Sequence, residues 1–139
     1  MHAADVDPRA LEHARRNLPD GAGVHAGHLL DALPYRLRGR VAVLAAVPPY
    51  VPSDRAHELP REARDHEPAG ALYAGADGLD RVRELIDTAG PWLAADGVVL
   101  LELARSQYPS AAGHARRAGW RTVRHDHPDV PTCVLGLRR

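Results

Sequence analysis

Strand and helix signals alternate along this chain of 139 residues, and that alternation limits its fold more than any other feature. Short apolar runs have the length of strands, and the segments between them carry apolar residues at helical spacing. This order predicts an α/β domain with a mostly parallel sheet, and the chain length predicts a single domain, residues 1–139. The expected strands are 2–5, 23–27, 40–47, 97–103, 120–125 and 132–138, and the expected helices are 8–18, 79–89 and 109–118.

Composition excludes several classes of protein. The 18 basic and 18 acidic residues balance, which argues against a broad surface for nucleic acid. Cys133 is the single cysteine, which fits a reducing compartment, and the first ten residues do not resemble a signal peptide. The longest apolar run, 41–51, has about half the length of a membrane-spanning helix. We therefore expect a cytoplasmic protein without membrane association.

Asp5 ends the first expected strand. Ligands of α/β sheets bind at the carboxyl ends of strands, where an acidic side chain can accept hydrogen bonds from both hydroxyls of a ribose. The alternative is that Asp5 caps the next helix. Asp7 is better placed for that role, because it directly precedes Pro8 at the first helical position.

The tetrapeptide Val47–Tyr50 follows the third expected strand, whose apolar sequence is typical of a strand covered on both faces. Pro48 and Pro49 fix the backbone and remove two donors, which leaves carbonyl groups free to face a crevice. The ring of Tyr50 can stack on a planar group such as an amide. A rigid turn that ends the strand is the alternative interpretation.

Two further polar segments contain candidate site residues. The His-Asp-His sequence at 125–127 has no third ligand at suitable spacing, so a solvated turn is favoured and no metal site is expected. The charged segment 58–70 is typical of a solvated loop, although Arg64 and Glu67 can order it over a crevice.

Five stretches of the chain follow one another in a familiar order: "AADVDPRALEHARRNL", "GHLLDALP", "VPPYVPSD", "REARDHEPAGALYAGADGLDRVRELI" and "GVVLLEL". Together they resemble the HemK-type release-factor N(5)-glutamine methyltransferases. The resemblance covers nearly the whole chain, and the stretch from Val47 to Ile86 makes it specific. Amino-methyltransferases in general share only the strand-end acid and the proline-tyrosine turn.

On the cofactor side, the resemblance implies a Rossmann-like class I methyltransferase fold that uses S-adenosylmethionine. Asp5 corresponds to the acid that holds the cofactor ribose. His28 stands near the cofactor, where many relatives have an aspartate.

On the substrate side, the resemblance implies methyl transfer to a glutamine side-chain amide of a peptide-chain release factor. Pro48, Pro49 and Tyr50 match the last three residues of an Asn-Pro-Pro-Tyr motif that binds this amide, and Glu67 is expected to contact the substrate. Val47 occupies the position of the asparagine, so one of two acceptors for the amide is lost.

The chain starts at what corresponds to the second strand of the family. The resemblance therefore implies that the first strand and the Gly-rich cofactor loop are absent, and we expect an incomplete sheet with open edges through which chains can self-associate. A non-catalytic remnant or partner-binding pseudoenzyme is the alternative to an active methyltransferase. A DNA adenine methyltransferase shares the turn, but the neutral charge and small size argue against it.

Overall fold

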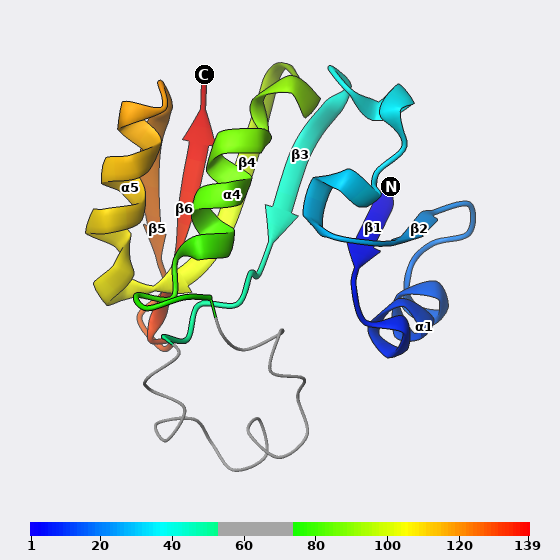
Figure 1. Cartoon of the computed structure of the whole chain (residues 1–139), viewed down its shortest axis with the longest axis horizontal. Coiled ribbons are helices and arrows are strands. Elements are labelled where there is room, and N and C mark those ends of the chain that lie inside the picture. The colour runs from blue at the N-terminus through cyan, green and yellow to red at the C-terminus, as the bar shows by residue number, and fades with distance from the viewer. Residues whose placement is uncertain (53–73) are drawn as a thin grey trace.

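The computed structural model describes residues 1–52 and 74–139, and these residues form two separate sheets (Figure 1). The strands are β1 (His2–Asp5), β2 (Gly23–Ala26), β3 (Val41–Ala46), β4 (Leu93–Ala104), β5 (Arg121–Asp126) and β6 (Thr132–Arg138). The helices are α1 (Pro8–Asn17), α4 (Asp80–Thr88) and α5 (Tyr108–Arg117), with 3₁₀ turns η1 (Leu29–Ala32), η2 (Tyr35–Leu37), η4 (Gly90–Trp92) and η5 (Arg105–Gln107). In these ranges, no helix has the length and apolar character needed to cross a bilayer.

The predicted α/β class is confirmed, but the sheets are mixed. β1 pairs with β2 in parallel, and the larger sheet has the order β3-β4-β6-β5. β3 runs parallel to β4, whereas β6 is antiparallel to both of its neighbours. The expectation of a mostly parallel sheet is therefore wrong for these strands. β5 and β6 are joined by the short connection 127–131, which suits only an antiparallel hairpin.

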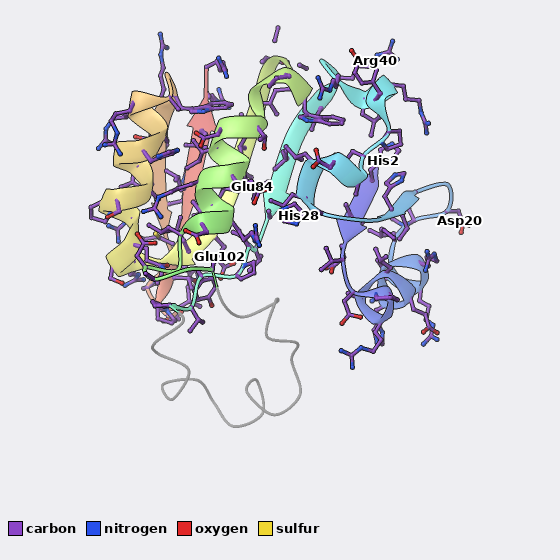
Figure 2. The ribbon with its side chains drawn as sticks, in the orientation of Figure 1. His2, Asp20, His28, Arg40, Glu84 and Glu102 are labelled. Atoms are coloured by element: carbon purple, nitrogen blue, oxygen red, sulfur yellow. The ribbon has the colours of Figure 1, made fainter. Side chains whose placement is uncertain are left out.

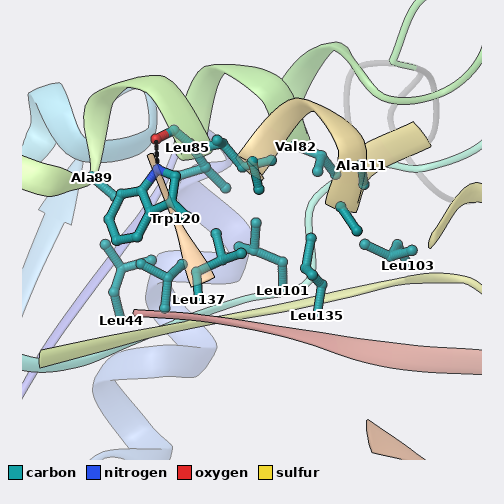
Figure 3. Close-up of a cluster of buried hydrophobic side chains, with 14 of the residues drawn as sticks. Leu44, Val82, Leu85, Ala89, Leu101, Leu103, Ala111, Trp120, Leu135 and Leu137 are labelled. Carbon is teal, nitrogen blue, oxygen red and sulfur yellow. Dashed lines mark hydrogen bonds between the residues drawn. The ribbon is translucent and has the colours of Figure 1, made fainter. Parts of the chain in front are cut away.

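Helices α4 and α5 cover one face of the larger sheet, and the main core lies between the helices and the strands (Figure 3). α4 buries Val82, Leu85 and Ile86, which recur at helical spacing. Trp120 closes the core, and its Nε1–H donates to the Ile86 carbonyl at 3.0 Å. Alternate strand residues point at the helices because the strand period is two. These residues are Leu44, Val99, Leu101, Leu103, Cys133, Leu135 and Leu137.

β1, α1 and β2 form a small unit beside the larger sheet. α1 begins as predicted, with the Asp7 side chain accepting a hydrogen bond from the Arg9 N–H at 2.8 Å and Pro8 in the first turn. Leu11 is the one buried residue of this helix. The main core cluster contains none of the described residues 1–26, and Leu30 of η1 is the first residue along the chain to enter it.

β3 is an edge strand of the larger sheet. Leu44 faces the core and is 8% exposed, whereas Val43, on the opposite face, is 58% exposed. The expectation that this strand is covered on both faces is therefore wrong. Among the described residues β3 pairs only with β4, so it has one unpaired edge as well as one exposed face.

Candidate functional site

A pocket of about 390 Å³ lies where β1 and β3 end, and we call it the strand-end pocket. Its size falls within the range of roughly 300–1,000 Å³ that is usual for small-molecule sites. The carboxyl ends of the two strands belong to different sheets, yet they line the same pocket. The polar and turn residues that line it are Asp5, Asp7, His28, Val47, Pro48, Pro49 and Arg81.

Asp5 is exposed at the end of β1, and its carboxylate already has one protein partner. The Asp7 N–H donates to Oδ1 of Asp5 at 2.8 Å. A carboxylate offers about four lone-pair sites, so this bond orients Asp5 without using its capacity for ligand hydroxyls. Asp7 caps α1, as predicted, so Asp5 does not serve as the cap of this helix, and its role toward a ribose stays a prediction.

His28, which lines the pocket, is bonded to a glutamate of α4. Its Nε2 lies 2.6 Å from Oε1 of Glu84, and Arg81 donates from Nη1 to the other carboxylate oxygen at 2.7 Å. Burial opposes ionisation of Glu84, but the hydrogen bonds from Arg81 and His28 prevail and lower its pKa. Figure 2 shows His28 and Glu84 beside one another, so this contact links the segment between β2 and η1 to the helix over the larger sheet.

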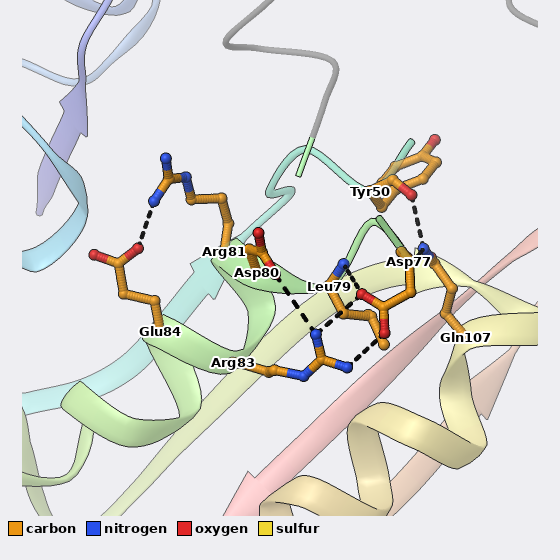
Figure 4. A network of polar contacts seen from close by, with 8 residues as sticks. All are labelled: Tyr50, Asp77, Leu79, Asp80, Arg81, Arg83, Glu84 and Gln107. Atoms are coloured by element: carbon orange, nitrogen blue, oxygen red, sulfur yellow. Dashed lines mark hydrogen bonds and ion pairs between the residues drawn. The ribbon is translucent and has the colours of Figure 1, made fainter. Parts of the chain in front are cut away.

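The backbone of the Val47–Tyr50 turn is held by a glutamine that sequence reasoning did not select. Nε2 of Gln107 donates to the Tyr50 carbonyl at 2.7 Å and to the Asp77 carbonyl at 2.9 Å (Figure 4). Oε1 of the same side chain accepts from the Ala104 N–H at 3.1 Å. Its spacing could have indicated this role, because Gln107 lies three residues after the end of β4, at the position where a capping box places a glutamine.

Gly78 packs directly against this turn. Its φ of +71° is a left-handed value that side chains disfavour, and an added Cβ would overlap the Tyr50 carbonyl oxygen and the Gln107 amide. A second link ties the same turn to the chain before α4, because the Ala74 N–H donates to the Val51 carbonyl at 3.3 Å. The turn is therefore fixed from one side by backbone and side-chain hydrogen bonds.

Asp77 fixes the loop on which Gly78 sits. Arg83 donates to both Asp77 carboxylate oxygens, at 3.0 and 2.5 Å, and the Leu79 N–H donates to one of them at 3.2 Å. The hydrogen bond from Arg83 lowers the pKa of Asp77 despite some loss of solvation. The carboxylate thus stays ionised and holds the start of α4 in place.

The structure brings most of the predicted site residues together. The strand-end pocket is lined by Asp5, His28, Val47, Pro48 and Pro49. Tyr50 is not one of the described residues that line this pocket. Its carbonyl accepts a hydrogen bond from Gln107. Glu67 lies outside the described residues.

Comparison with curated proteins finds close sequence relatives. The chain is 38% identical over 133 residues to the release factor glutamine methyltransferase of Streptomyces coelicolor, covering 94% of this chain and 46% of that protein. It is 43% identical over 108 residues to the ribosomal protein uL3 glutamine methyltransferase of Bordetella pertussis, covering 74% and 35% respectively. The chain belongs to the HemK-type glutamine methyltransferase family. It spans about half or less of the length of these family members.

Solved structures agree with this family assignment at the level of the fold. A methyltransferase from Pyrococcus furiosus superposes with a TM-score of 0.69 at 16% identity, covering 98% of this chain and 60% of that one. A TehB-like SAM-dependent methyltransferase from Corynebacterium glutamicum gives a TM-score of 0.58 at 12% identity, covering 99% and 67%. The chain therefore has part of a Rossmann-like methyltransferase fold. No family model matches the chain.

Proposed function

We propose that this chain carries the ribose-binding and amide-binding residues of an S-adenosylmethionine-dependent methyltransferase that acts on a glutamine side chain of a protein. A release factor or a ribosomal protein is the proposed substrate class, since two relatives are named for these. The observation that carries the proposal is that Asp5 and the Val47–Pro49 turn, from different sheets, line one pocket.

Asp5 is the proposed ribose ligand. Its carboxylate is exposed, sits at a strand end and is oriented by the Asp7 N–H, as a group that accepts two hydroxyls requires. His28 lines the same pocket and would lie near the cofactor, with its Nε2 bonded to Glu84. Bound S-adenosylmethionine supplies a methyl group on a sulfonium sulfur. These residues fit the ribose part of the cofactor.

The Val47–Tyr50 turn is the proposed amide-binding element. A proline carbonyl can accept one N–H of a glutamine amide, and Gln107 and Gly78 keep the turn rigid behind it. Rigid positioning is the main contribution that a protein makes to a transfer of this kind. Val47 is 68% exposed and its side chain has no acceptor for the second N–H, so amide binding by this turn is expected to be weak.

This deficit at Val47 favours a second candidate function: a partner-binding family member that holds cofactor or protein without methyl transfer. The two functions share the ribose site and differ in the amide site. Substitution of Val47 therefore separates them.

Calorimetric titration with S-adenosylmethionine tests the cofactor half of the proposal. Binding at millimolar concentration or tighter is expected, and absence of heat at millimolar cofactor contradicts it. Methyl transfer from labelled cofactor to a bacterial release factor tests the other half. Val47→Asn restores an acceptor worth about 1–3 kcal/mol, so transfer should rise about tenfold or more.

Val123→Asn is the matched control, because Val123 is similarly exposed, at 53%, and lies on β5 away from the strand-end pocket. It should leave transfer unchanged. If Val47→Asn binds cofactor but transfer stays at background, the partner-binding function is favoured.

A further inference from the structure

A hollow of about 550 Å³ lies on the face of the larger sheet opposite to α4 and α5, and we call it the sheet-face hollow. Leu135 and Leu137 of β6 point into the core beneath the helices, so Gly136 and Arg138 point to the other face, because the strand period is two. Among the described residues, none lines both this hollow and the strand-end pocket. The hollow is therefore a separate place at which a ligand can bind.

Two arginines stand directly opposite one another in this hollow. Arg121 of β5 and Arg138 of β6 are Cα partners in the antiparallel ladder, and both line the hollow. Like charges in directly opposite positions of neighbouring strands destabilise a sheet. In the described part of the chain, neither guanidinium forms an ion pair or a side-chain hydrogen bond. Arg124 on the other face of β5, by contrast, is paired with Asp126 at 2.8 Å.

The charges around the arginine pair leave the hollow positive. Arg139 also lines it, and its guanidinium lies over the Trp120 ring, 4.8 Å from the centroid. Asp96 is the one acidic residue among the described residues that line the hollow. Three guanidiniums against one carboxylate leave an excess of two positive charges when His125 is neutral. A hollow with such an excess attracts an anion.

The floor of the hollow lies at Gly136, which has no side chain. Its register partners are Val123 on β5 and Leu100 on β4, so an apolar side chain rises on each side of this position. His125 adds a ring, since its Nε2 lies 3.6 Å from the place that a Cβ of Gly136 would occupy. That distance is ordinary van der Waals contact, so the fold leaves room here. The open floor between apolar walls therefore fits a flat ring.

The arginine pair and the open floor are spaced like the parts of a nucleotide. Arg138 lies two residues beyond Gly136 on β6, which places its Cα about 7 Å further along the strand. A ribose bridges a comparable gap between the base and the 5′-phosphate of a nucleotide. The floor can therefore hold the ring while the pair holds the phosphate.

The charge of the arginine pair favours a phosphate over a carboxylate. The fork of an arginine binds a phosphate through two parallel hydrogen bonds. A phosphate monoester carries about −1.5 to −2 charges at neutral pH, which is close to the charge of the pair. A carboxylate carries one charge and would leave one of the two arginines without a partner.

We propose that the sheet-face hollow binds a nucleoside 5′-monophosphate, with its phosphate between Arg121 and Arg138 and its base over Gly136 beside His125. This unit can come from a free nucleotide or from the 5′-phosphorylated end of an RNA strand, since both present the same phosphate and ring. S-adenosylmethionine has no phosphate. The site is therefore distinct from the strand-end pocket, and the inference does not rest on the proposed methyl transfer.

Titration with guanosine 5′-monophosphate, followed through backbone amide chemical shifts, tests the proposal. Binding at millimolar concentration or tighter is expected, with shifts in residues 121–125 and 135–138 and none at Asp5 or Val47. Guanosine, which lacks the phosphate, should bind at least about tenfold more weakly, because the hydrogen bonds to a charged group are lost.

Two arginine variants test the place of the phosphate. Arg121→Gln should lower the affinity for guanosine 5′-monophosphate at least about tenfold. Arg117→Gln is the matched control, because Arg117 is also exposed but lies on α5, on the other side of the sheet, and should leave the affinity unchanged. Arg121→Gln also removes the like-charge opposition, so its urea midpoint should equal or exceed that of the parent, which separates lost binding from lost fold.

Gly136→Val tests the place of the base. Valine suits a strand, and a Cβ at this position meets no atom closer than 3.6 Å, so the variant should fold with its floor filled. The affinity for guanosine 5′-monophosphate should fall at least about tenfold. The affinity for inorganic phosphate should stay the same, because the arginine pair remains.

A 5′-phosphorylated RNA trinucleotide distinguishes the two sources of the ligand. Binding about tenfold tighter than that of guanosine 5′-monophosphate assigns the site to an RNA end, and equal or weaker binding assigns it to a free nucleotide.

Four results would each overturn the proposal: no binding of guanosine 5′-monophosphate at millimolar concentration, shifts confined to the strand-end pocket, equal affinities for the nucleotide and guanosine, or equal effects of the two arginine variants. The titration contains no S-adenosylmethionine and measures no methyl transfer, so its failure is distinct from failure of the proposed function.

Discussion

The side-chain amide of Gln107 holds the backbone carbonyl of Tyr50 at 2.7 Å, although the two residues are 57 positions apart in the sequence. The same nitrogen also holds the Asp77 carbonyl, so one side chain joins the turn after β3 to the loop before α4. The candidate amide-binding turn thus depends on a residue that does not line the strand-end pocket.

Gln107→Leu should destabilise the chain. The substitution keeps the approximate size of the side chain but leaves the carbonyls of Tyr50 and Asp77 without their donor, which costs about 1–3 kcal/mol of unfolding free energy. Urea denaturation measures this loss. Ser106→Ala, one position earlier and exposed, should stay within about 0.5 kcal/mol of the parent, and an equal loss in both variants would contradict the prediction.

Gly78→Ala should cost more than Gly119→Ala. Both glycines have left-handed φ values, +71° and +86°, so alanine introduces backbone strain of about 1 kcal/mol at either position. At Gly78 the added methyl group also overlaps the Tyr50 carbonyl, whereas at Gly119 no atom lies within 4 Å. The difference between the two unfolding free energies should exceed about 1 kcal/mol. Equal unfolding free energies of the two variants would mean that the Val47–Tyr50 turn shifts to make room for the added methyl group.

The Asp77–Arg83 ion pair should make stability depend on pH on the acid side. The pKa of Asp77 is lowered in the folded state, so its contribution is present above the unfolded value of 3.8 and is lost as pH falls through the folded value. The two side chains are 49% and 35% exposed, which limits the effect to about 1 kcal/mol or less.

Asp77→Asn should therefore flatten the stability profile below about pH 4, as measured by urea denaturation at a series of pH values. Asp20→Asn, at an exposed aspartate outside this ion pair, should keep the parent profile. A profile that is unchanged by Asp77→Asn would place the acid-sensitive group elsewhere.

Asp5→Asn should weaken cofactor binding about tenfold, since a carboxylate that accepts ribose hydroxyls is worth about 1.4 kcal/mol or more over an amide. The asparagine oxygen can still accept the Asp7 N–H, so the turn should remain folded. Calorimetry gives the affinity, with Asp31→Asn in η1 as the control. Unchanged affinity would restrict Asp5 to holding the turn.

Local patterns predicted the elements well. The helical spacing of Val82, Leu85 and Ile86 predicted α4, and the apolar runs predicted six strands within a few residues of their observed bounds. The helix start at Asp7 was also correct, because a cap depends only on its nearest neighbours. β4 begins earlier than expected, at Leu93, since pairing with β3 extends it beyond its apolar centre.

Relationships between distant residues could not be predicted in the same way. The partner of His28 is Glu84, 56 residues away, and no periodicity links the two. The place of β6 between β4 and β5 likewise depends on tertiary packing. The apolar sequence of β3 indicated burial on both faces. Burial of a face requires another element packed against it, and the sequence of one strand does not show whether such an element is present.

The small β1–α1–β2 unit contributes no described residue to the main core cluster. The free energy that keeps this unit folded is therefore largely separate from that of the larger sheet, and its melting need not coincide with that of α4 and α5. A ligand that contacts both Asp5 and Val47 would couple the two units. Its binding would then appear in a calorimetric scan as a gain of cooperativity, with two overlapping transitions merging into one.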